Sequence, residues 1–488
     1  MTLVPTEEQK ACIKAAKENQ FVMVNAYAGC SKTTTLKMIA DEIVTPSLYI
    51  AFNKSIADEA KAKFPSYVEC KTSHSMAYAA VGKDYAHKLK RPQGRYMNVC
   101  GTGSEIANYF KIEDMKLDSG DSITSSAIGV AVRDTVGRFE QSSDLKIKSH
   151  HVSFSPVARF VEKELLDKKE WRKTIQKYAE KLWSLRTNTK TNILCTHDTY
   201  LKLWQLSKPD LSNYEIIYLD ESQDSNPCLL DIIYSQKSKV VLVGDKYQAI
   251  YSWRGAVNAM DQDGGKNWKE CLLSASFRYG ESVAKVANAI LDLDDNLLVK
   301  GNGTDSISHK LKGDENHTRI YRTNAALIAD AVHYITKGKE CSLEIDTHDL
   351  VKLLESAAAL KVGNLKGVKH DDLVAYKSWY ELEQESPSSI APIISMVNKN
   401  LHYTALGVLK EHRNPLNPEI IFVTAHKSKG REWDTVVLAE DFKSPMVKGE
   451  FVGLTEEERN LLYVSATRAK KLLIYNQPVK DYLDHYDI

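Results

Sequence analysis

The sequence lacks the features of membrane and secreted proteins. No apolar run approaches the roughly 18 residues of a membrane span, and Ala391 to Val397 is among the longest runs. The N-terminal segment MTLVPTEEQK has no basic start followed by an apolar stretch, so we expect no secretory signal. The eight cysteines include no C-x-x-C pair, which argues against a disulfide scaffold or zinc ribbon and favours a reducing compartment. We therefore expect a cytoplasmic protein with no membrane partner.

The sequence also has almost no net charge. Its 65 Lys and Arg residues and 64 Asp and Glu residues leave a formal charge of +1, which gives no overall attraction to polyanions but does not exclude a local basic groove. Hydrophobic residues at 43% and charged residues at 26% are ordinary for a globular protein. At about 150 residues per domain, the 488 residues predict about three domains.

Two sets of short apolar runs alternate with helical stretches. The runs are 21–25, 48–52, 216–219 and 240–243 in the first set, and 319–321, 420–423, 435–438 and 472–475 in the second. Continuous apolar strands that alternate with helices are typical of parallel sheets covered on both faces. The sequence therefore predicts the α/β class with two parallel-sheet domains, whose ligands would bind at the carboxyl ends of the strands.

Two segments lack this strand pattern and are predicted to be mainly helical insertions, at 76–190 and 326–414. Within the first, residues 167–190 carry eight Lys or Arg against three Asp or Glu. This run indicates either the border of a nucleic-acid duplex or, more commonly, a solvated helix face. Residues 101–126 are rich in Gly, Ser and Asp and are expected to form the most mobile loop.

A small-residue loop between the first strand and its helix has the character of a phosphate-binding loop. Its central residues are Ala28, Gly29, Cys30, Ser31, Lys32, Thr33 and Thr34. Backbone N–H groups at a helix N-terminus bind anions, a lysine reaches the β- and γ-phosphates, and the next hydroxyl holds Mg²⁺. The strict pattern fails at Ala26 and Ser31, where glycines are expected. On this segment alone, an ordinary turn with a solvated lysine is an equally good interpretation.

Polar groups follow two later strands. Asp220 and Glu221 end an apolar run, as a Mg²⁺-binding carboxylate and a general base would, although either could be a helix N-cap. Gln248 follows the next strand and would bring an amide to the same sheet edge. Phe277 and Arg278, considered alone, are more typical of a buried aromatic beside a surface arginine.

The order of these motifs resembles that of superfamily 1 DNA helicases of the UvrD/Rep/PcrA type. Some eight motifs follow the family's order from Gln9 to Arg468, and chance agreement of so many is negligible. Within the family, the chain is most similar to the helicase portion of F-box DNA helicases, with no F-box segment ahead of it. The segments that carry this closer resemblance are 52–54, 197–204 and 251–260.

The resemblance implies two RecA-like P-loop domains with accessory insertions. The first RecA-like domain would comprise 1–75 and 191–277, and the second 278–325 and 415–488. The insertions 76–190 and 326–414 would be the two accessory domains.

The resemblance also implies an ATP site between the two RecA-like domains, with Mg²⁺ as the metal. The catalytic residues would be Lys32, Asp220, Glu221, Gln248, Arg278 and Arg468. Thr33 and Asp220 would hold the metal, Glu221 would deprotonate the attacking water, and the arginines would stabilise the γ-phosphoryl charge. Besides the loop 28–34, the nucleotide would contact Gln9 through adenine, Phe277 by stacking and Glu432 through ribose. Gln9 also completes a helix capping box with Thr6, and the two roles can coexist.

Single-stranded DNA would bind to stacking aromatics and polar groups, as non-specific strand binding requires. The residues that match the family are Phe52, Asn53, His74, Tyr251, Trp253, Arg254, Arg322, Asn324 and His426. Trp253 is the strongest single candidate, since one base stack is worth about 1–3 kcal/mol, although a lone Trp is more often part of a core. His150 and His151 lack metal-ligand spacing and are interpreted as structural or surface residues.

The sequence therefore predicts an ATP-driven single-stranded DNA translocase and helicase. The family implies 3′ to 5′ movement, DNA forks as substrates, recombinase or replication proteins as partners, roles in repair, recombination or replication, and activity as a monomer. The protein would be nucleoid-associated if prokaryotic or viral. The resemblance implies a strand-separating hairpin after the final accessory insertion or near the last motifs. Only twenty residues follow Arg468, so any such hairpin is expected to be short or missing at that end, which favours a protein-displacing remodeller with weak unwinding as the alternative. A third hypothesis, an ATP-binding regulatory module, rests on Ser31.

Overall fold

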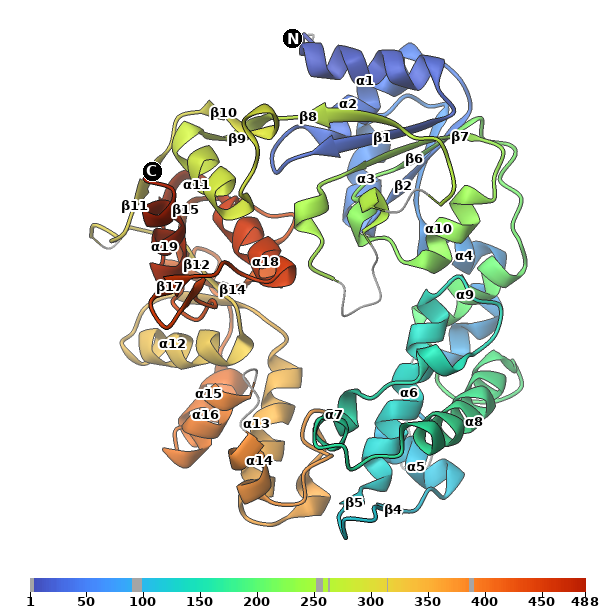
Figure 1. The fold of residues 1–488 in the computed structure, drawn as a ribbon, viewed down its shortest axis with the longest axis vertical. Helices are drawn as coiled ribbons and strands as arrows, with labels where there is room; N and C mark the ends of the chain where they lie inside the picture. Colours follow the sequence, from blue (N-terminus) through green and yellow to red (C-terminus); the bar gives the residue numbers. More distant parts are fainter. Residues whose placement is uncertain (1–3, 90–98, 252–257, 262–263, 314, 386–389) are drawn as a thin grey trace.

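The computed structural model describes residues 4–89, 99–251, 258–261, 264–313, 315–385 and 390–488. Two α/β domains lie side by side at one end of the molecule, and two helical insertions extend from them and meet at the other end (Figure 1). The predicted fold class, parallel sheets with mainly helical insertions, is confirmed. None of the helices in the described ranges is long and apolar enough to cross a membrane.

The first sheet has six parallel strands in the order β3-β2-β6-β7-β1-β8. Their bounds are Phe21–Ala26 (β1), Ser47–Ala51 (β2), Val68–Thr72 (β3), Ile216–Leu219 (β6), Lys239–Gly244 (β7) and Lys269–Leu273 (β8). The sheet's helices are Glu7–Glu18 (α1), Lys32–Glu42 (α2), Lys54–Lys63 (α3), Ser73–Ala80 (α4), His197–Leu206 (α9) and Pro227–Tyr234 (α10). The four apolar runs predicted for this sheet are its central strands, and the two edge strands are more polar.

The second sheet also has six parallel strands, in the order β11-β18-β15-β12-β14-β13. Their bounds are Ser306–Ser308 (β11), His317–Tyr321 (β12), Cys341–Glu344 (β13), Ile420–Thr424 (β14), Trp433–Leu438 (β15) and Ala469–Ile474 (β18). Its helices are Glu281–Leu291 (α11), Asn324–Thr336 (α12), Ala425–Ser428 (α17), Glu456–Ala466 (α18) and Gln477–His485 (α19). Two small sheets pair Ala275–Gly280 (β9) with Lys300–Gly303 (β10), and Met446–Val447 (β16) with Glu450–Phe451 (β17).

One predicted boundary differs from the structure. Strand β13 lies within 326–414, the segment expected to be a helical insertion, yet it pairs in parallel with β14 at the edge of the second sheet. The helical part of this insertion therefore begins after Glu344. It consists of Thr347–Lys361 (α13), Trp379–Glu385 (α14), Ala391–Asn398 (α15) and His402–Glu411 (α16).

The largest apolar core runs through both α/β domains. It contains Val24 and Val243 from the first sheet together with Val423 and Leu473 from the second. Tyr463 of α18 belongs to the same core and is fully buried. The shared core holds α18 of the second domain against the first domain, where the nucleotide motifs lie.

The first insertion has regular elements within 101–126, where a loop was expected, and the mobility of the remaining residues stays a prediction. Its elements are Gly103–Phe110 (α5), Met115–Lys116 (β4), Ser122–Ile123 (β5), Ser125–Gln141 (α6), Ala158–Glu162 (α7) and Lys168–Thr187 (α8). Helix α5 packs so closely on α6 that a Cβ at Gly129 would lie 2.0 Å from the carbonyl oxygen of Gly103. Gly103 permits this close helix packing, whereas Gly120 has open space around it in the turn between β4 and β5.

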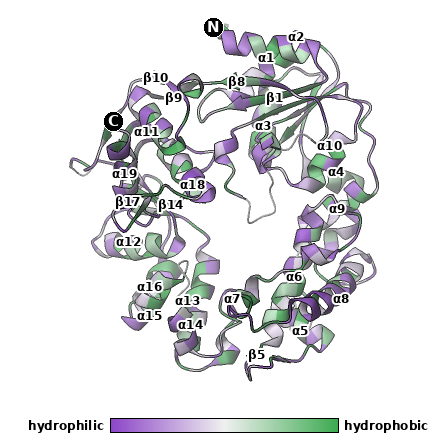
Figure 2. Cartoon of the chain, viewed as in Figure 1, coloured by the Kyte–Doolittle hydropathy of each residue, from purple (hydrophilic) through white to green (hydrophobic). Residues whose placement is uncertain are grey.

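The basic run 167–190 forms α8, which is amphipathic. Its buried residues Trp171, Ile175, Ala179 and Leu182 recur at helical spacing. Figure 2 shows α8 among the more hydrophilic helices. Most of the basic residues therefore lie on the solvated face of a packed helix, whereas Arg186 is buried and pairs with Glu140. A role beside duplex DNA stays a prediction.

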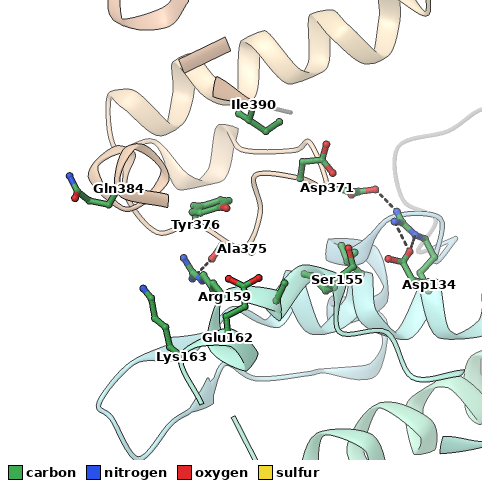
Figure 3. A pocket seen from close by; sticks show the side chains of 15 residues that line it. Asp134, Ser155, Arg159, Glu162, Lys163, Asp371, Ala375, Tyr376, Gln384 and Ile390 are labelled. Carbon is green, nitrogen blue, oxygen red and sulfur yellow. Dashed lines mark hydrogen bonds and ion pairs between the residues drawn. The ribbon is translucent and has the colours of Figure 1, made fainter. Parts of the chain in front are cut away.

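The two insertions meet around a cavity of about 620 Å³. Arg159 of α7 donates a hydrogen bond of 2.9 Å to the carbonyl oxygen of Ala375, as Figure 3 shows, and forms an ion pair of 2.5 Å with Glu381. Arg133 of α6 forms a second ion pair, with Asp371. Polar contacts around a cavity therefore make up much of this junction.

Candidate nucleotide and single-strand binding site

The phosphate-loop segment lies between β1 and α2, as the sequence predicted. Gly29 has φ +79°, and a Cβ there would lie 2.4 Å from Ser276 Oγ and 2.7 Å from Arg278 Cβ. Ser31 caps α2 with φ 56° and ψ 41°, a left-handed conformation that is costly for a residue with a Cβ. Helix α2 nevertheless begins at Lys32. The loop therefore keeps the geometry of a helix N-terminus that can bind an anion.

The two predicted metal partners are in contact. Thr33 Oγ1 donates a hydrogen bond of 2.9 Å to Asp220 Oδ2, and the Tyr49 hydroxyl donates one of 2.5 Å to the same oxygen. Burial and the neighbouring Glu221 raise the pKa of Asp220, and the two hydroxyl donors counteract this. A hydroxyl and a carboxylate are oxygen ligands of the kind that Mg²⁺ prefers, so the pair fits this metal.

Glu221 lies opposite the phosphate-loop lysine. Lys32 Nζ is 3.1 Å from Glu221 Oε1, and Gln223 Nε2 donates a hydrogen bond of 2.6 Å to the other carboxylate oxygen. Burial alone would raise the pKa of Glu221, but Lys32 and Lys429 lower it to about 2. Glu221 itself has φ 51°, so a second left-handed residue lies at this site, as is common at functional sites.

Arg468 brings the second domain to the first. Its Nη2 lies 3.3 Å from Gln248 Oε1, while Gln248 Nε2 donates a hydrogen bond of 2.7 Å to Asp245 Oδ2. Arg468 is 1% exposed, and burial together with the charge of Arg278 lowers the pKa of its guanidinium to about 9. A buried arginine close to the partly buried Arg278 favours the binding of an anion between the domains.

One cavity of about 100 Å³ unites these groups. Its lining includes Gly29, Lys32, Glu221, Gln248, Arg278 and Arg468. Five of the six predicted catalytic residues therefore line one cavity between the domains, and Asp220 adjoins it next to Glu221.

Two of the remaining nucleotide candidates contact residues that line this cavity. Arg278 Nε is 2.7 Å from Glu432 Oε2, and the backbone N–H of Phe277 donates a hydrogen bond of 2.9 Å to the carbonyl oxygen of Gly29. The Phe277 ring is 49% exposed and can therefore be reached by a ligand. Gln9 makes the expected capping box, and its Nε2 also donates to Thr35 Oγ1 at 3.1 Å. The capping role of Gln9 is confirmed, and its contact with adenine stays a prediction.

Several site residues were not assigned a role from the sequence. Lys429 Nζ is 2.6 Å from an Asp224 carboxylate oxygen, and it also donates to the carbonyl oxygen of Gln248. Burial raises the pKa of Asp224 to about 6, although Lys429 opposes this rise. Tyr463 and Asp245 also belong to the site. The one available signal was that Asp245 ends an apolar run, as Asp220 does.

Three predicted strand-binding residues form an aromatic group beside the cavity. Phe52 and Tyr251 are nearly parallel, with ring centroids 6.0 Å apart and an interplanar angle of 13°. Tyr251 lies 6.1 Å from the His426 ring, and its hydroxyl donates a hydrogen bond of 3.0 Å to the carbonyl oxygen of His426. Phe52 is 45% exposed, and Asn53 caps α3 beside it. The group joins the first domain to α17 of the second.

The other strand-binding candidates are not members of this group, although His74 lines a small cavity together with Phe52, and two candidates cannot be placed. Trp253 and Arg254 fall within 252–257, outside the described residues. His74 Nε2 is 3.0 Å from Asp198 Oδ1. Arg322 donates to both carboxylate oxygens of Glu458, at 2.7 and 2.5 Å, so a DNA phosphate would compete with an existing ion pair. Asn324 is exposed at the first turn of α12.

One group of side chains has the spacing of metal ligands but the wrong protonation. Ligand atoms of Asp144, His150 and His151 lie within 4.8 Å of one another. The backbone N–H of Lys148 donates to His151 Nδ1 at 2.9 Å, so in neutral His151 the proton is on Nε2, the atom that faces Asp144. A protonated Nε2 cannot bind a metal, which agrees with a structural role.

Comparison with known proteins places this geometry in a family. The model of the UvrD/REP helicase N-terminal domain matches residues 5–263, and that of the UvrD-like helicase C-terminal domain matches residues 168–477. The chain is 32% identical to F-box DNA helicase protein 1 of Schizosaccharomyces pombe, over 97% of this chain and 57% of that protein. It is 30% identical to F-box DNA helicase 1 of Gallus gallus, over 98% of this chain and 49% of that protein.

A more distant relative is a probable DNA helicase II homolog of Mycoplasma genitalium, 26% identical over 58% of this chain and 42% of that protein. The chain thus spans about half the length of the F-box DNA helicases that it matches. Both family models together cover nearly the whole chain, in the order that the motifs indicated. The protein belongs to the UvrD-like helicase family.

Proposed function

We propose that the protein is an ATP-driven single-stranded DNA translocase and DNA helicase that moves 3′ to 5′. One observation carries the proposal: the cavity that holds Lys32, Glu221 and Arg468 is also lined by Phe52 and Tyr251. A rearrangement around a nucleotide would therefore reach the stacking aromatics directly. Its relatives are named as DNA helicases, which supports DNA as the substrate.

The chain's own residues account for a hydrolytic step. Lys32 and the loop N–H groups would bind phosphate, and Thr33 with Asp220 would hold Mg²⁺, which when bound neutralises phosphate charge. A phosphate on Lys32 would take that ammonium away from Glu221. Glu221 would then be free of its ion pair with Lys32, so its carboxylate could accept a proton from the attacking water.

Coupling to movement would arise from groups that cross between the domains. Arg468 contacts Gln248, and Lys429 contacts Asp224, in each case from the second domain to the first. Loss of the γ-phosphate would remove the anion that these cations share, and the domains would then separate more easily. Because His426 and Tyr251 join the same two domains, separation would change the spacing of the stacking group.

A second candidate is a remodeller that displaces proteins from single-stranded DNA and unwinds weakly. The observation that favours it is the shortness of the hairpin β16–β17, which has two residues in each strand. Recombinase or replication proteins would then be the partners, and we propose that the protein acts as a monomer in the cytoplasm.

The deciding experiment measures steady-state ATP hydrolysis with and without single-stranded DNA, with Glu221→Gln as the blank. DNA-stimulated hydrolysis that vanishes in the blank is the expected result. Forks with either a 3′ or a 5′ tail then determine polarity, and a protein-coated strand distinguishes displacement from unwinding. Absence of hydrolysis under both conditions would refute the motor and favour an ATP-binding regulatory module.

A further inference from the structure

We propose that Tyr463 is a positioning residue that ties the phosphate loop and the Gln248 sensor to the position of the second domain. This role rests on the proposed function. Tyr463 lies in α18 and is fully buried. Its hydroxyl accepts a hydrogen bond of 2.9 Å from the backbone N–H of Ala28 and donates one of 2.9 Å to Asp245 Oδ2.

A single hydroxyl of the second domain thus joins two strand ends of the first. Ala28 follows β1 and Asp245 follows β7, and these strands are hydrogen-bonded neighbours. The hydroxyl donates its single proton to Asp245, and its oxygen accepts the hydrogen bond from Ala28. If the domains separated, a buried backbone donor and a buried carboxylate would each lose a partner, which is costly.

Asp245 transmits the position of Tyr463 to Gln248. The same oxygen, Oδ2, accepts from Tyr463 and from Gln248 Nε2. Since an amide nitrogen can only donate, this bond turns Gln248 Oε1 towards Arg468. Arg468 follows α18, so one short segment of the second domain contacts both ends of the Tyr463–Asp245–Gln248 chain.

The surroundings of Asp245 predict a pH signature for the network. Lys32 is the cation that faces it, and the other titratable neighbours are Cys30, Tyr27 and Tyr279. Burial raises the pKa of Asp245, while Lys32 and the hydrogen bonds from Gln248 and Tyr463 counteract the rise. Loss of the Tyr463 hydroxyl would raise this pKa further, so Asp245 would become protonated at a higher pH.

Tyr463→Phe tests the role because it removes only the hydroxyl. We expect kcat for DNA-stimulated hydrolysis to fall about tenfold, as for one buried hydrogen bond, while the dissociation constant of a fluorescent ADP analogue changes less than about threefold. The acidic limb of the kcat–pH profile should move to higher pH. In a Gln248→Ala background, the further loss of kcat should be much smaller, because both residues act through Asp245.

Tyr218→Phe is the matched control, since it removes a hydroxyl from another fully buried tyrosine of the same core, one that lies outside the cavity lined by the nucleotide groups. Thermal unfolding checks both variants. Asp245→Asn is the second variant if Tyr463→Phe is too unstable, and it should give the same loss of kcat.

Either of two results would overturn the role of Tyr463. The first is a kcat of Tyr463→Phe equal to that of Tyr218→Phe. The second is a lower kcat whose kcat–pH profile keeps its acidic limb in place and whose loss adds fully to that of Gln248→Ala. ATP hydrolysis by the wild-type protein tests the proposed function independently of Tyr463. Its absence would refute the proposed function, whereas normal wild-type hydrolysis beside an unaffected Tyr463→Phe would refute only the positioning role.

Discussion

Replacement of Ser31 by glycine should relax the phosphate loop without removing any contact that the loop needs. Ser31 has φ 56°, and its side chain makes no capping hydrogen bond to α2. Its carbonyl oxygen accepts from the backbone N–H of Thr35 at 3.0 Å, a bond that glycine keeps. A strained left-handed residue costs about 1–3 kcal/mol, and glycine's extra unfolded-state entropy offsets about 0.5–1 kcal/mol of the gain. We therefore expect a net stabilisation of about 0–2 kcal/mol.

Hydrolysis in Ser31→Gly should equal or exceed that of the wild type, because the phosphate-binding N–H groups stay in place. The assays are thermal unfolding and steady-state ATP hydrolysis with saturating single-stranded DNA. Lys111→Gly is the matched control, since Lys111 has φ 54° at the end of α5, far from the nucleotide groups in sequence and outside the cavity that they line. It should gain stability without any change in hydrolysis. A lower rate in Ser31→Gly, with Lys111→Gly unchanged, would show that the loop depends on the serine and refute the reasoning.

Three further predictions concern other parts of the chain. Gly29→Ala should lower hydrolysis about tenfold or more, because its Cβ would lie 2.4 Å from Ser276 Oγ at φ +79°; a wild-type rate would contradict the packing argument. The pKa of Asp224 is raised to about 6 in the folded protein, whereas in the unfolded chain it is near 4. The folded state therefore binds more protons between these values, so the contribution of Asp224 to the unfolding free energy should fall as pH rises from about 4 to about 6. Asp224→Asn should remove that part of the pH dependence, and denaturant titrations of both proteins across this range would show it. Arg159→Ala should raise hydrogen–deuterium exchange around Ala375 about tenfold, since a charge-assisted hydrogen bond between the insertions is lost; unchanged exchange would show that other contacts hold the junction.

The sequence predicted the central strands of both sheets but not the strands at the sheet edges. Val240 to Val243 is buried on both faces of the first sheet, so its residues are uniformly apolar and recognisable. Strand β3 reads Val-Glu-Cys-Lys-Thr and pairs on one side only, so solvent permits polar residues and the apolar signal disappears. Strand β13 is short and also at an edge, which explains why it was included in the helical insertion.

The site could be predicted where a residue's role depends on its place along one strand or loop. Asp220 and Gln248 follow strands, Lys32 follows the loop, and each lies at the sheet edge where its position in the sequence placed it. Contacts made across the domains had no such signal. Tyr463 lies 435 positions from Ala28 and 218 from Asp245, and nothing in the local sequence of α18 distinguishes a core tyrosine from one whose hydroxyl has two partners.

Contacts across the domains have no signal in the local sequence, which explains why the unpredicted residues lie mostly between the domains. A phosphate-binding group is positioned by its own strand and loop, whereas a group that depends on the relative position of the domains must contact both of them. Lys429 and Tyr463 meet this requirement, since each reaches from the second domain to a buried carboxylate of the first. Separation of the domains would leave Asp224 and Asp245 without these partners, at a cost that the nucleotide's own contacts would have to exceed. In the proposed translocase, the coupling of hydrolysis to movement would therefore depend on buried carboxylates that need not touch ATP, and variants at their partners should alter coupling more than nucleotide affinity.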